Sequence, residues 1–184
     1  MLKDFHATHN FIQASFHLIG TDLHGLLTNT YFPQDLHQKL EVMDALTALN
    51  SNRQYPLWIS GGDFNIITNL GEKKGGRMKL EDDSTGFKEF IQSNQLMDIQ
   101  TSNGTYTWKN KRRGTHNIAS RLDRFLILEN AIHLGGDFHA SILPQGGFDH
   151  WPIMLQWTRP SIHCNRPFRF EAFWFTHPDF KDMV

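Results

Sequence analysis

Short apolar runs, separated by polar stretches rich in glycine and proline, organise this chain of 184 residues. The first two runs are Phe11–Ile19 and Leu26–Phe32. The polar segment Thr21–Gly25 separates them, and Pro33 ends the second. Runs of this length with such boundaries predict two β-strands.

Two segments carry apolar residues at helical spacing. In the first they recur every three or four residues, which predicts one buried helix face formed by Leu36, Leu40, Met43, Leu46 and Leu49. A second predicted helix has one inward side, formed by Phe87, Phe90, Ile91 and Gln95. Its predicted N-cap is Asp83 or Ser84.

The remaining apolar runs predict further strands. Leu57–Ser60 ends in two glycines, as a buried strand would, and delivers Asp63 and Asn65 at its exit, whereas the polar Gly71–Lys79 predicts a loop. Four more strands are predicted, at Thr105–Trp108, Leu122–Leu128, Phe138–Leu143 and Ile153–Trp157. Strands outnumber helices in this mixture, so the sequence predicts a single α/β (α+β) domain.

Composition narrows the class of protein. Hydrophobic residues make up 39% of the chain, and the net charge is −1, so nucleic-acid binding would need a local basic patch. The single cysteine, Cys164, excludes an internal disulfide and favours a reducing compartment. Met1–Gly20 has no long apolar stretch, so we expect an intracellular protein without a signal peptide or membrane partner.

The first candidate site residues are Asp63 and Asn65, two positions apart after a strand. If the chain stays extended there, both side chains point to the same side. The carboxylate could accept a proton from water or approach a cation, and the amide could donate to a phosphate oxygen or hold that water. An Asx-rich turn is the alternative interpretation.

Asp149 and His150 lie in the loop between the last two predicted strands. They could supply a cation ligand and an acid–base group, or form an incidental surface turn. Asp123 lies within an apolar strand, where a carboxylate needs a partner: either Arg121 or Arg124, or a histidine N–H that it orients. No role is expected for the early histidines, His6, His9, His17, His24 and His37.

A basic turn follows the aromatic residues Tyr106 and Trp108, and its charges are Lys109, Lys111, Arg112 and Arg113. It is either a solvated hairpin tip or a loop that contacts phosphates, the second being favoured by the adjacent aromatic rings. The charged segment Glu72–Arg77 is interpreted as a solubilising loop. Tyr31 is interpreted as a packed strand residue with its hydroxyl at the sheet edge.

Taken in order, four motifs resemble those of the endonuclease/exonuclease/phosphatase superfamily: Thr30–Pro33, Gly62–Asn65, Leu122–Leu126 and Asp149-His150. The likeness is greatest to the apurinic-site-type endonuclease domain of plant non-LTR retrotransposon polyproteins. It covers most of the chain and includes Trp58–Asn65, Glu72–Gly76, Tyr106–Trp108, Ser120–Leu126 and Pro167–Trp174.

The resemblance implies a two-sheet β-sandwich flanked by helices. It also implies Mg²⁺- or Mn²⁺-dependent attack of water on a phosphodiester, with DNA as the substrate. By this resemblance Asp63 would activate the water, Asn65 would position it, and Tyr31 would lie near the scissile phosphate.

The same resemblance assigns Asp149 to the metal site and His150 to the phosphate, with Asp123 holding the imidazole. Two departures stand out. The family's opening third, with an Asn and a metal-binding Glu, has no counterpart in Met1–Gly20, so the sandwich is expected to be incomplete. Phe148 stands where the family usually has Ser. Together they imply weak or absent activity for this chain.

The implied organisation is an endonuclease-like domain over 1–158 and a linker-like tail over 159–184, leading toward a reverse transcriptase region. Three functions follow: a DNA-nicking domain of a mobile element, acting in the nucleus; a non-catalytic remnant with at most weak nucleic-acid binding; or a phosphomonoesterase of the same superfamily. The basic turn favours a polymeric substrate, and the missing Glu favours the remnant.

Overall fold

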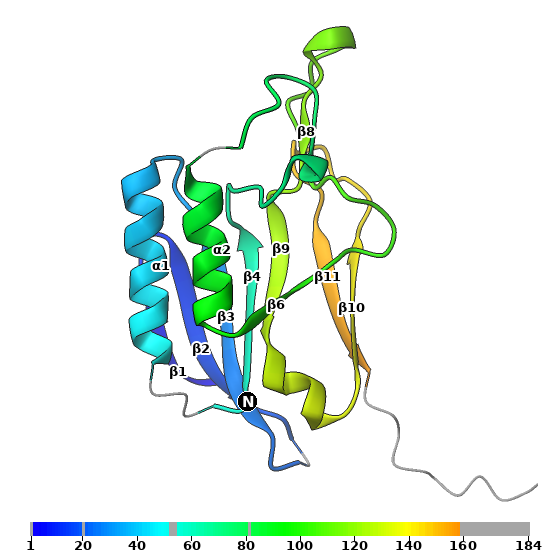
Figure 1. The fold of residues 1–184 in the computed structure, drawn as a ribbon. Coiled ribbons are helices and arrows are strands. Elements are labelled where there is room, and N and C mark those ends of the chain that lie inside the picture. The colour runs from blue at the N-terminus through cyan, green and yellow to red at the C-terminus, as the bar shows by residue number, and fades with distance from the viewer. Residues whose placement is uncertain (1, 20, 52–54, 81, 159–184) are drawn as a thin grey trace, which may run out of the picture.

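A computed structural model describes residues 2–19, 21–51, 55–80 and 82–158. The predicted tail over 159–184 lies outside them. The body has three layers: two helices, a six-stranded mixed sheet, and a two-stranded sheet on the opposite face (Figure 1). The prediction of two packed sheets flanked by helices is confirmed.

The large sheet has the strand order β1-β2-β3-β4-β9-β6. Its strands are β1 (Leu2–Ala7), β2 (Phe11–His17), β3 (His24–Tyr31), β4 (Leu57–Asp63), β6 (Leu96–Ile99) and β9 (Asp123–Leu128). All neighbours pair antiparallel except β3 and β4, whose parallel pairing requires the crossover that α1 supplies. Strands β1 and β6 were not predicted from the sequence.

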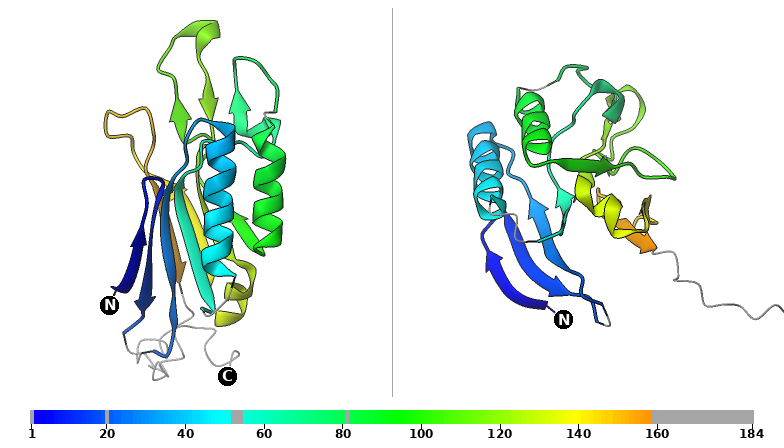
Figure 2. Two further views of the ribbon diagram at one scale, coloured as in Figure 1. Left: turned by 90° about the vertical axis from the view of Figure 1, so that its left-hand side faces the viewer. Right: turned by 60° about the horizontal axis from the view of Figure 1, so that its bottom comes forward.

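Helices α1 (Leu36–Asn50) and α2 (Asp83–Ser93) cover one face of this sheet (Figure 2). The predicted apolar face of α1 is rotated from the observed one. Met43 and Leu46 are buried with Val42, but Lys39 replaces the exposed Leu40 on the inner side. The predicted inner residues Leu36 and Leu49 are likewise exposed.

The predicted start of α2 is wrong by one or two residues. Asp82 is the N-cap and makes no side-chain capping bond, while Asp83 and Ser84 lie buried in the first turn. Asp83 accepts a hydrogen bond from Lys39, and Ser84 donates to the backbone oxygen of Ile67 at 2.6 Å. The helix ends at Ser93, before the predicted inner residue Gln95, whose φ of 53° lies in the left-handed region.

Alternate residues of the central strands point to opposite faces of the large sheet and belong to two separate hydrophobic cores. Trp58 and Leu126 face the helices and pack with Phe87 among others, whereas Leu57 and Ile127 face the second sheet. That sheet pairs β10 (Asp137–Ile142) antiparallel with β11 (Ile153–Thr158). Within the described residues, neither helix is long and apolar enough to cross a bilayer.

A small sheet projects from one end of the body, with the order β5-β8-β7 (Figure 1). Its strands are β5 (Lys73–Lys74), β7 (Trp108–Lys109) and β8 (Ala119–Ser120). The predicted strand Thr105–Trp108 is therefore reduced to β7, and its partner across the basic turn is β8. The run 122–128 instead forms β9 in the large sheet. Within the described residues there are also three short 3-10 helices: η1 (Leu70–Glu72), η2 (Gly114–His116) and η3 (Glu129–Leu134).

Candidate active site

Three side chains from distant parts of the chain converge where β4 ends and β9 begins. Asp63 and Asp123 are opposite each other in the antiparallel ladder. His150 reaches them from the loop before β11, held by a bridge to Trp108 in β7. One donor atom from each of Asp63, Asp123 and His150 lies within 4.8 Å of the others.

The imidazole of His150 is oriented between the two carboxylates. Its Nδ1 lies 2.9 Å from Oδ2 of Asp123, and its Nε2 lies 3.8 Å from Oδ2 of Asp63. Protonated at Nδ1, the ring donates to Asp123 and presents Nε2 toward the Asp63 side. The structure thus agrees with the interpretation in which Asp123 orients a histidine, and not with its pairing to Arg121 or Arg124.

Asp63 is buried, and its environment makes its carboxyl harder to ionise than an exposed one. Desolvation raises the pKa of this carboxyl above its ordinary value, and the neighbouring charge of Asp123 acts in the same direction. The backbone N–H of Asn65 and the charges of His150 and Lys39 oppose the shift without cancelling it. A carboxylate in this setting has a greater affinity for a proton than an exposed one.

The segment after β4 turns sharply instead of remaining extended. The N–H of Asn65 donates to Oδ1 of Asp63 at 2.9 Å, and the φ of Asn65 is 51°. Nδ2 of Asn65 donates to the backbone oxygen of Phe32 at 2.7 Å, and its Oδ1 accepts from Gln34 at 2.8 Å. The chain does not stay extended here, so of the two interpretations the Asx-rich turn describes the local geometry.

Sequence reasoning missed a buried cation behind this turn. Nζ of Lys39, in α1, donates to the backbone oxygen of Asn65 at 2.8 Å and pairs with Asp83 in α2. Both charged side chains are almost fully buried. The pair ties both helices to the turn that carries Asp63. A lysine next to an apolar helix stripe was the only sequence signal for it.

The arginines that flank Asp123 form a buried charge cluster of their own. Arg121 and Arg124 are fully buried and each pairs with both Glu72 and Asp98, at 2.6–3.2 Å. Burial alone would raise the pKa of Glu72, but the charges and hydrogen bonds of the two arginines hold it below its ordinary value. Two acids balance two bases, so the strand end that carries Asp123 is anchored without a net buried charge.

Asp149 lies outside the three-residue cluster. Its carboxylate is exposed and accepts a hydrogen bond from Nε1 of Trp108 at 3.0 Å. That hydrogen bond is the main cause that lowers the pKa of Asp149. Phe148, where the family usually has Ser, is exposed to solvent.

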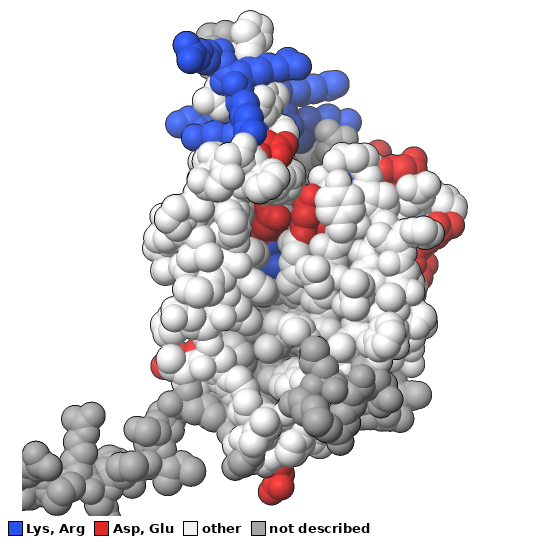
Figure 3. Space-filling model, turned by 180° about the vertical axis from the view of Figure 1, so that it is seen from behind, with Lys and Arg blue, Asp and Glu red and all other residues white. Residues whose placement is uncertain are grey.

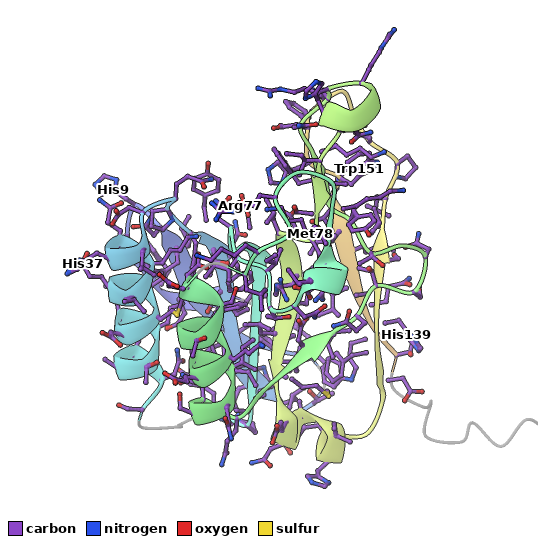
Figure 4. All side chains as sticks on the ribbon, turned by 45° about the horizontal axis from the view of Figure 1, so that its top comes forward. His9, His37, Arg77, Met78, His139 and Trp151 are labelled. Carbon is purple, nitrogen blue, oxygen red and sulfur yellow. The ribbon has the colours of Figure 1, made fainter. Side chains whose placement is uncertain are left out.

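Tyr31 is opposite Asp63 in the parallel register of β3 and β4, so it borders the site. Its side chain is 63% exposed, so its interpretation as a packed strand residue was wrong. The exposed histidines His9, His37 and His139 lie at the periphery of the molecule (Figure 4).

Basic side chains gather on the projecting sheet beside the site. Lys73 and Lys74 lie on β5, on one side of β8, and the predicted turn with Lys109, Lys111, Arg112 and Arg113 continues from β7 on the other side. Nζ of Lys109 lies 5.1 Å from the ring centre of Trp151, and Nζ of Lys111 donates to the backbone oxygen of Gly147 at 2.9 Å. In Figure 3 the Lys and Arg atoms (blue) gather at the top of the molecule, on the projecting sheet, and Asp and Glu atoms (red) lie below them on the same side. The sequence interpretation of Glu72–Arg77 as a separate solubilising loop did not foresee this grouping.

Solved structures share this architecture. An endonuclease/exonuclease/phosphatase family protein from Bacteroides thetaiotaomicron matches with a TM-score of 0.55 and 14% identity, covering 82% of this chain and 55% of its own. The endonuclease domain of TRAS1, a telomere-specific non-LTR retrotransposon, matches with a TM-score of 0.60 and 18% identity, covering 84% of this chain and 65% of its own. The chain has the endonuclease/exonuclease/phosphatase fold.

A third protein with this fold is the 3′ phosphatase NExo from Neisseria, solved bound to a product DNA hairpin. It matches with a TM-score of 0.62 and 14% identity, over 86% of this chain and 72% of its own. Neither a protein-family model nor a curated protein matches the sequence. The chain spans only 55–65% of the first solved structures it matches, so part of their fold has no counterpart here.

Proposed function

We propose that the Asp63–Asp123–His150 cluster hydrolyses phosphodiester bonds in DNA with the help of a divalent cation. The observation that carries the proposal is the convergence of these three donors at adjoining strand ends. The shared fold supports it, because solved proteins with this fold include a nuclease domain and a phosphatase bound to DNA.

Each side chain would have a distinct part in the reaction. A water molecule would attack phosphorus and pass its proton to the carboxylate of Asp63, whose raised pKa suits a base. As the new P–O bond forms, the P–O bond on the opposite side breaks, and the leaving alkoxide takes up a proton from solvent water. The imidazole of His150, held by Asp123, faces the phosphate and stabilises the charge that develops on its oxygens. Asn65 would position the water once its amide leaves Phe32, and exposed Tyr31 would contact the substrate beside Asp63.

The carboxylates fit a hard cation, since Mg²⁺ and Mn²⁺ are commonly held by one or two carboxylates together with water and substrate phosphates. The Asp123 oxygen that does not accept from His150 is the near ligand, and the exposed carboxylate of Asp149, whose pKa is lowered, would join it on leaving Trp108. Asp63 then remains the base. Such a cation would neutralise charge on the phosphate during the reaction.

The basic projection supports a polymeric substrate. Lysines and arginines spread over β5, β7 and the turn that follows β7 could contact several phosphates of one strand, and a small phosphate ester could not use them all. We further propose an origin in a non-LTR retrotransposon endonuclease and a nuclear location. The ordered motifs and the likeness to the TRAS1 domain support this origin.

The decisive experiment is nicking of supercoiled plasmid by the purified chain in Mg²⁺. Asp63→Ala and His150→Ala should abolish nicking, as should EDTA, whereas the exposed control His139→Ala should retain it. Equal residual nicking by the wild type and both site variants would identify a contaminant and overturn the catalytic proposal.

DNA binding is tested separately by retention on a DNA column across a salt series. Replacing Lys111, Arg112 and Arg113 with alanine should lower the salt slope by about one for each phosphate that these side chains neutralise. The exposed lysine of α2 is the control, and Lys88→Ala should leave the slope unchanged. Retention without nicking would favour the non-catalytic remnant, and hydrolysis of p-nitrophenyl phosphate without retention would favour the phosphomonoesterase.

A further inference from the structure

The loop that joins β10 to β11 carries an exposed aromatic ring beside the candidate site. Phe148 comes directly before Asp149 and His150, and its side chain is 75% exposed. Two residues of extended chain span at most about 7 Å, so the backbone of Phe148 lies within that reach of His150. Figure 2 (left view) shows the loop, coloured between yellow and orange, standing clear of both sheets.

Its exposure sets Phe148 apart from nearly all other phenylalanines. Within the described residues Phe5, at 77%, is the only other exposed one. Phe5 lies on a strand of the large sheet, whereas Phe148 lies on a loop among charged groups. A Cβ atom added to Gly146 or Gly147 would have no neighbouring atom within 4 Å, so this side of the loop has open space for a ligand.

The backbone around Phe148 is held in place although its ring is exposed. Nζ of Lys111 donates to the backbone oxygen of Gly147 at 2.9 Å. On the other side, the N–H of Lys109 donates to the backbone oxygen of Asp149 at 3.0 Å. A ring on a fixed backbone loses less conformational freedom on binding than a ring on an untethered loop. The loop therefore presents Phe148 ready to bind.

The side chain of Lys111 adds a positive charge next to the ring. An ammonium group has three N–H donors, and the bond to Gly147 uses one of them. The other two could bind a phosphate of a strand whose base lies against Phe148. Lysines beside aromatic rings are typical of surfaces that bind single-stranded nucleic acid, where the charges follow the backbone and the bases stack on the rings.

We propose that the ring of Phe148 stacks on an unpaired base next to the phosphate that the site hydrolyses, so that the substrate is DNA with a single-stranded stretch at the cut. This inference rests on the proposed function and names the substrate class of the same site. A base inside a duplex has both faces stacked already, and a side chain can insert there only by unstacking it. An unpaired base offers its face without that cost. A protein partner is less favoured, because one ring among lysines is not a continuous apolar patch.

The test is binding of fluorescent oligonucleotides in EDTA, measured by anisotropy, so that no strand is cut. One ligand is a thymidine oligomer of about ten nucleotides, and the other is an abasic oligomer of the same length, with the same phosphates and no bases. Phe148→Ala should weaken binding of the thymidine oligomer about 5–150-fold, the range for loss of one base–aromatic stack. Binding of the abasic oligomer and the salt slope of both should not change, because no phosphate contact is lost.

Three further variants separate stacking from other effects. Phe148→Trp should bind the thymidine oligomer at least as tightly as the wild type, whereas Phe148→Leu, apolar but without a ring, should recover little. Phe5→Ala, with the same residue type and nearly the same exposure, is the matched control and should change neither affinity. Circular dichroism verifies the fold of each variant.

Equal affinity of the wild type and Phe148→Ala for the thymidine oligomer would overturn the proposal, as would absence of binding by the wild type. Full recovery by Phe148→Leu, or equal weakening on a paired duplex of the same length, would overturn it as well. Plasmid nicking together with equal thymidine affinities would remove this inference and leave the proposed function standing. Loss of thymidine binding in Phe148→Ala, without nicking by the wild type, would support the stacking and remove the catalytic proposal.

Discussion

Neutralising Glu72 should damage the fold, because two buried arginines depend on its charge. Its carboxylate accepts from Arg121 at 2.8 Å, twice from Arg124, at 3.1 and 3.2 Å, and from the N–H of Thr68 at 2.6 Å. Glu72→Gln keeps the shape but removes the charge and turns an amide N–H₂ toward existing donors. Two buried arginines would then share Asp98 alone, leaving one positive charge uncompensated.

Breaking a buried ion pair from one side costs about 3–5 kcal/mol, against a total stability of about 5–15 kcal/mol for ordinary proteins. Urea unfolding followed by tryptophan fluorescence should show this loss as a lower midpoint at constant slope. The control is Glu41→Gln, because Glu41 pairs with His37 on the exposed side of α1. Its effect should stay within about 0.5 kcal/mol.

The pH dependence gives an independent check. Because the pKa of Glu72 lies below its ordinary value, the stabilisation is present above that ordinary value and is lost as the pH falls through the lowered pKa. The gap between wild type and Glu72→Gln should therefore narrow in acid. A midpoint for Glu72→Gln that matches Glu41→Gln at neutral pH would refute this account of the charge cluster.

Three further substitutions test the surroundings of the site. Asp123→Asn should reduce nicking about 10–100-fold, because it releases the imidazole of His150, and should cost little stability. Unchanged nicking would mean that Asp123 does not orient His150. Lys39→Met should destabilise the chain by about 3–5 kcal/mol, because it leaves Asp83 buried without its cation; chemical denaturation tests this, and recovery is expected when Asp83→Leu is added. Trp108→Phe should raise the pKa of Asp149 by removing its main hydrogen bond, as carboxyl NMR titration would show, and an unaltered titration would contradict that cause.

Elements with strong apolar runs could be predicted from the sequence, and their details could not. Both helices and the strands β2, β3, β4, β9, β10 and β11 occur where the pattern placed them. The inner face of α1 was misassigned because its spacing counts Leu40 as core, whereas the ion pair with Asp83 draws Lys39 inside. Spacing alone does not distinguish an apolar side chain from a charged one whose partner lies on another helix.

In the candidate site, too, some contacts could be predicted from the sequence and others could not. Proximity of Asp123 to His150 was one of two interpretations, and the structure distinguishes them because other acids occupy the neighbouring arginines. Those acids, Glu72 and Asp98, lie far away in the sequence and had no signal as partners. The Asx turn at Asn65 has a local hydrogen bond to Asp63, whereas the contacts of the Asn65 side chain with Phe32 and Gln34 require the parallel pairing of β3 and β4.

The pairing of Asp63 with Asp123 in the ladder also determines when the site can form during synthesis of the chain. During synthesis β3 is made before β4 and can pair with it at once. The other neighbour of β4, strand β9, begins only at Asp123, so Asp63 and Asp123 leave the ribosome at different times. At about 5–20 residues per second, roughly 3–12 s pass between them. During that interval a central strand of the sheet has one open edge in the nascent chain. A chaperone that binds extended polypeptide would have its best opportunity then.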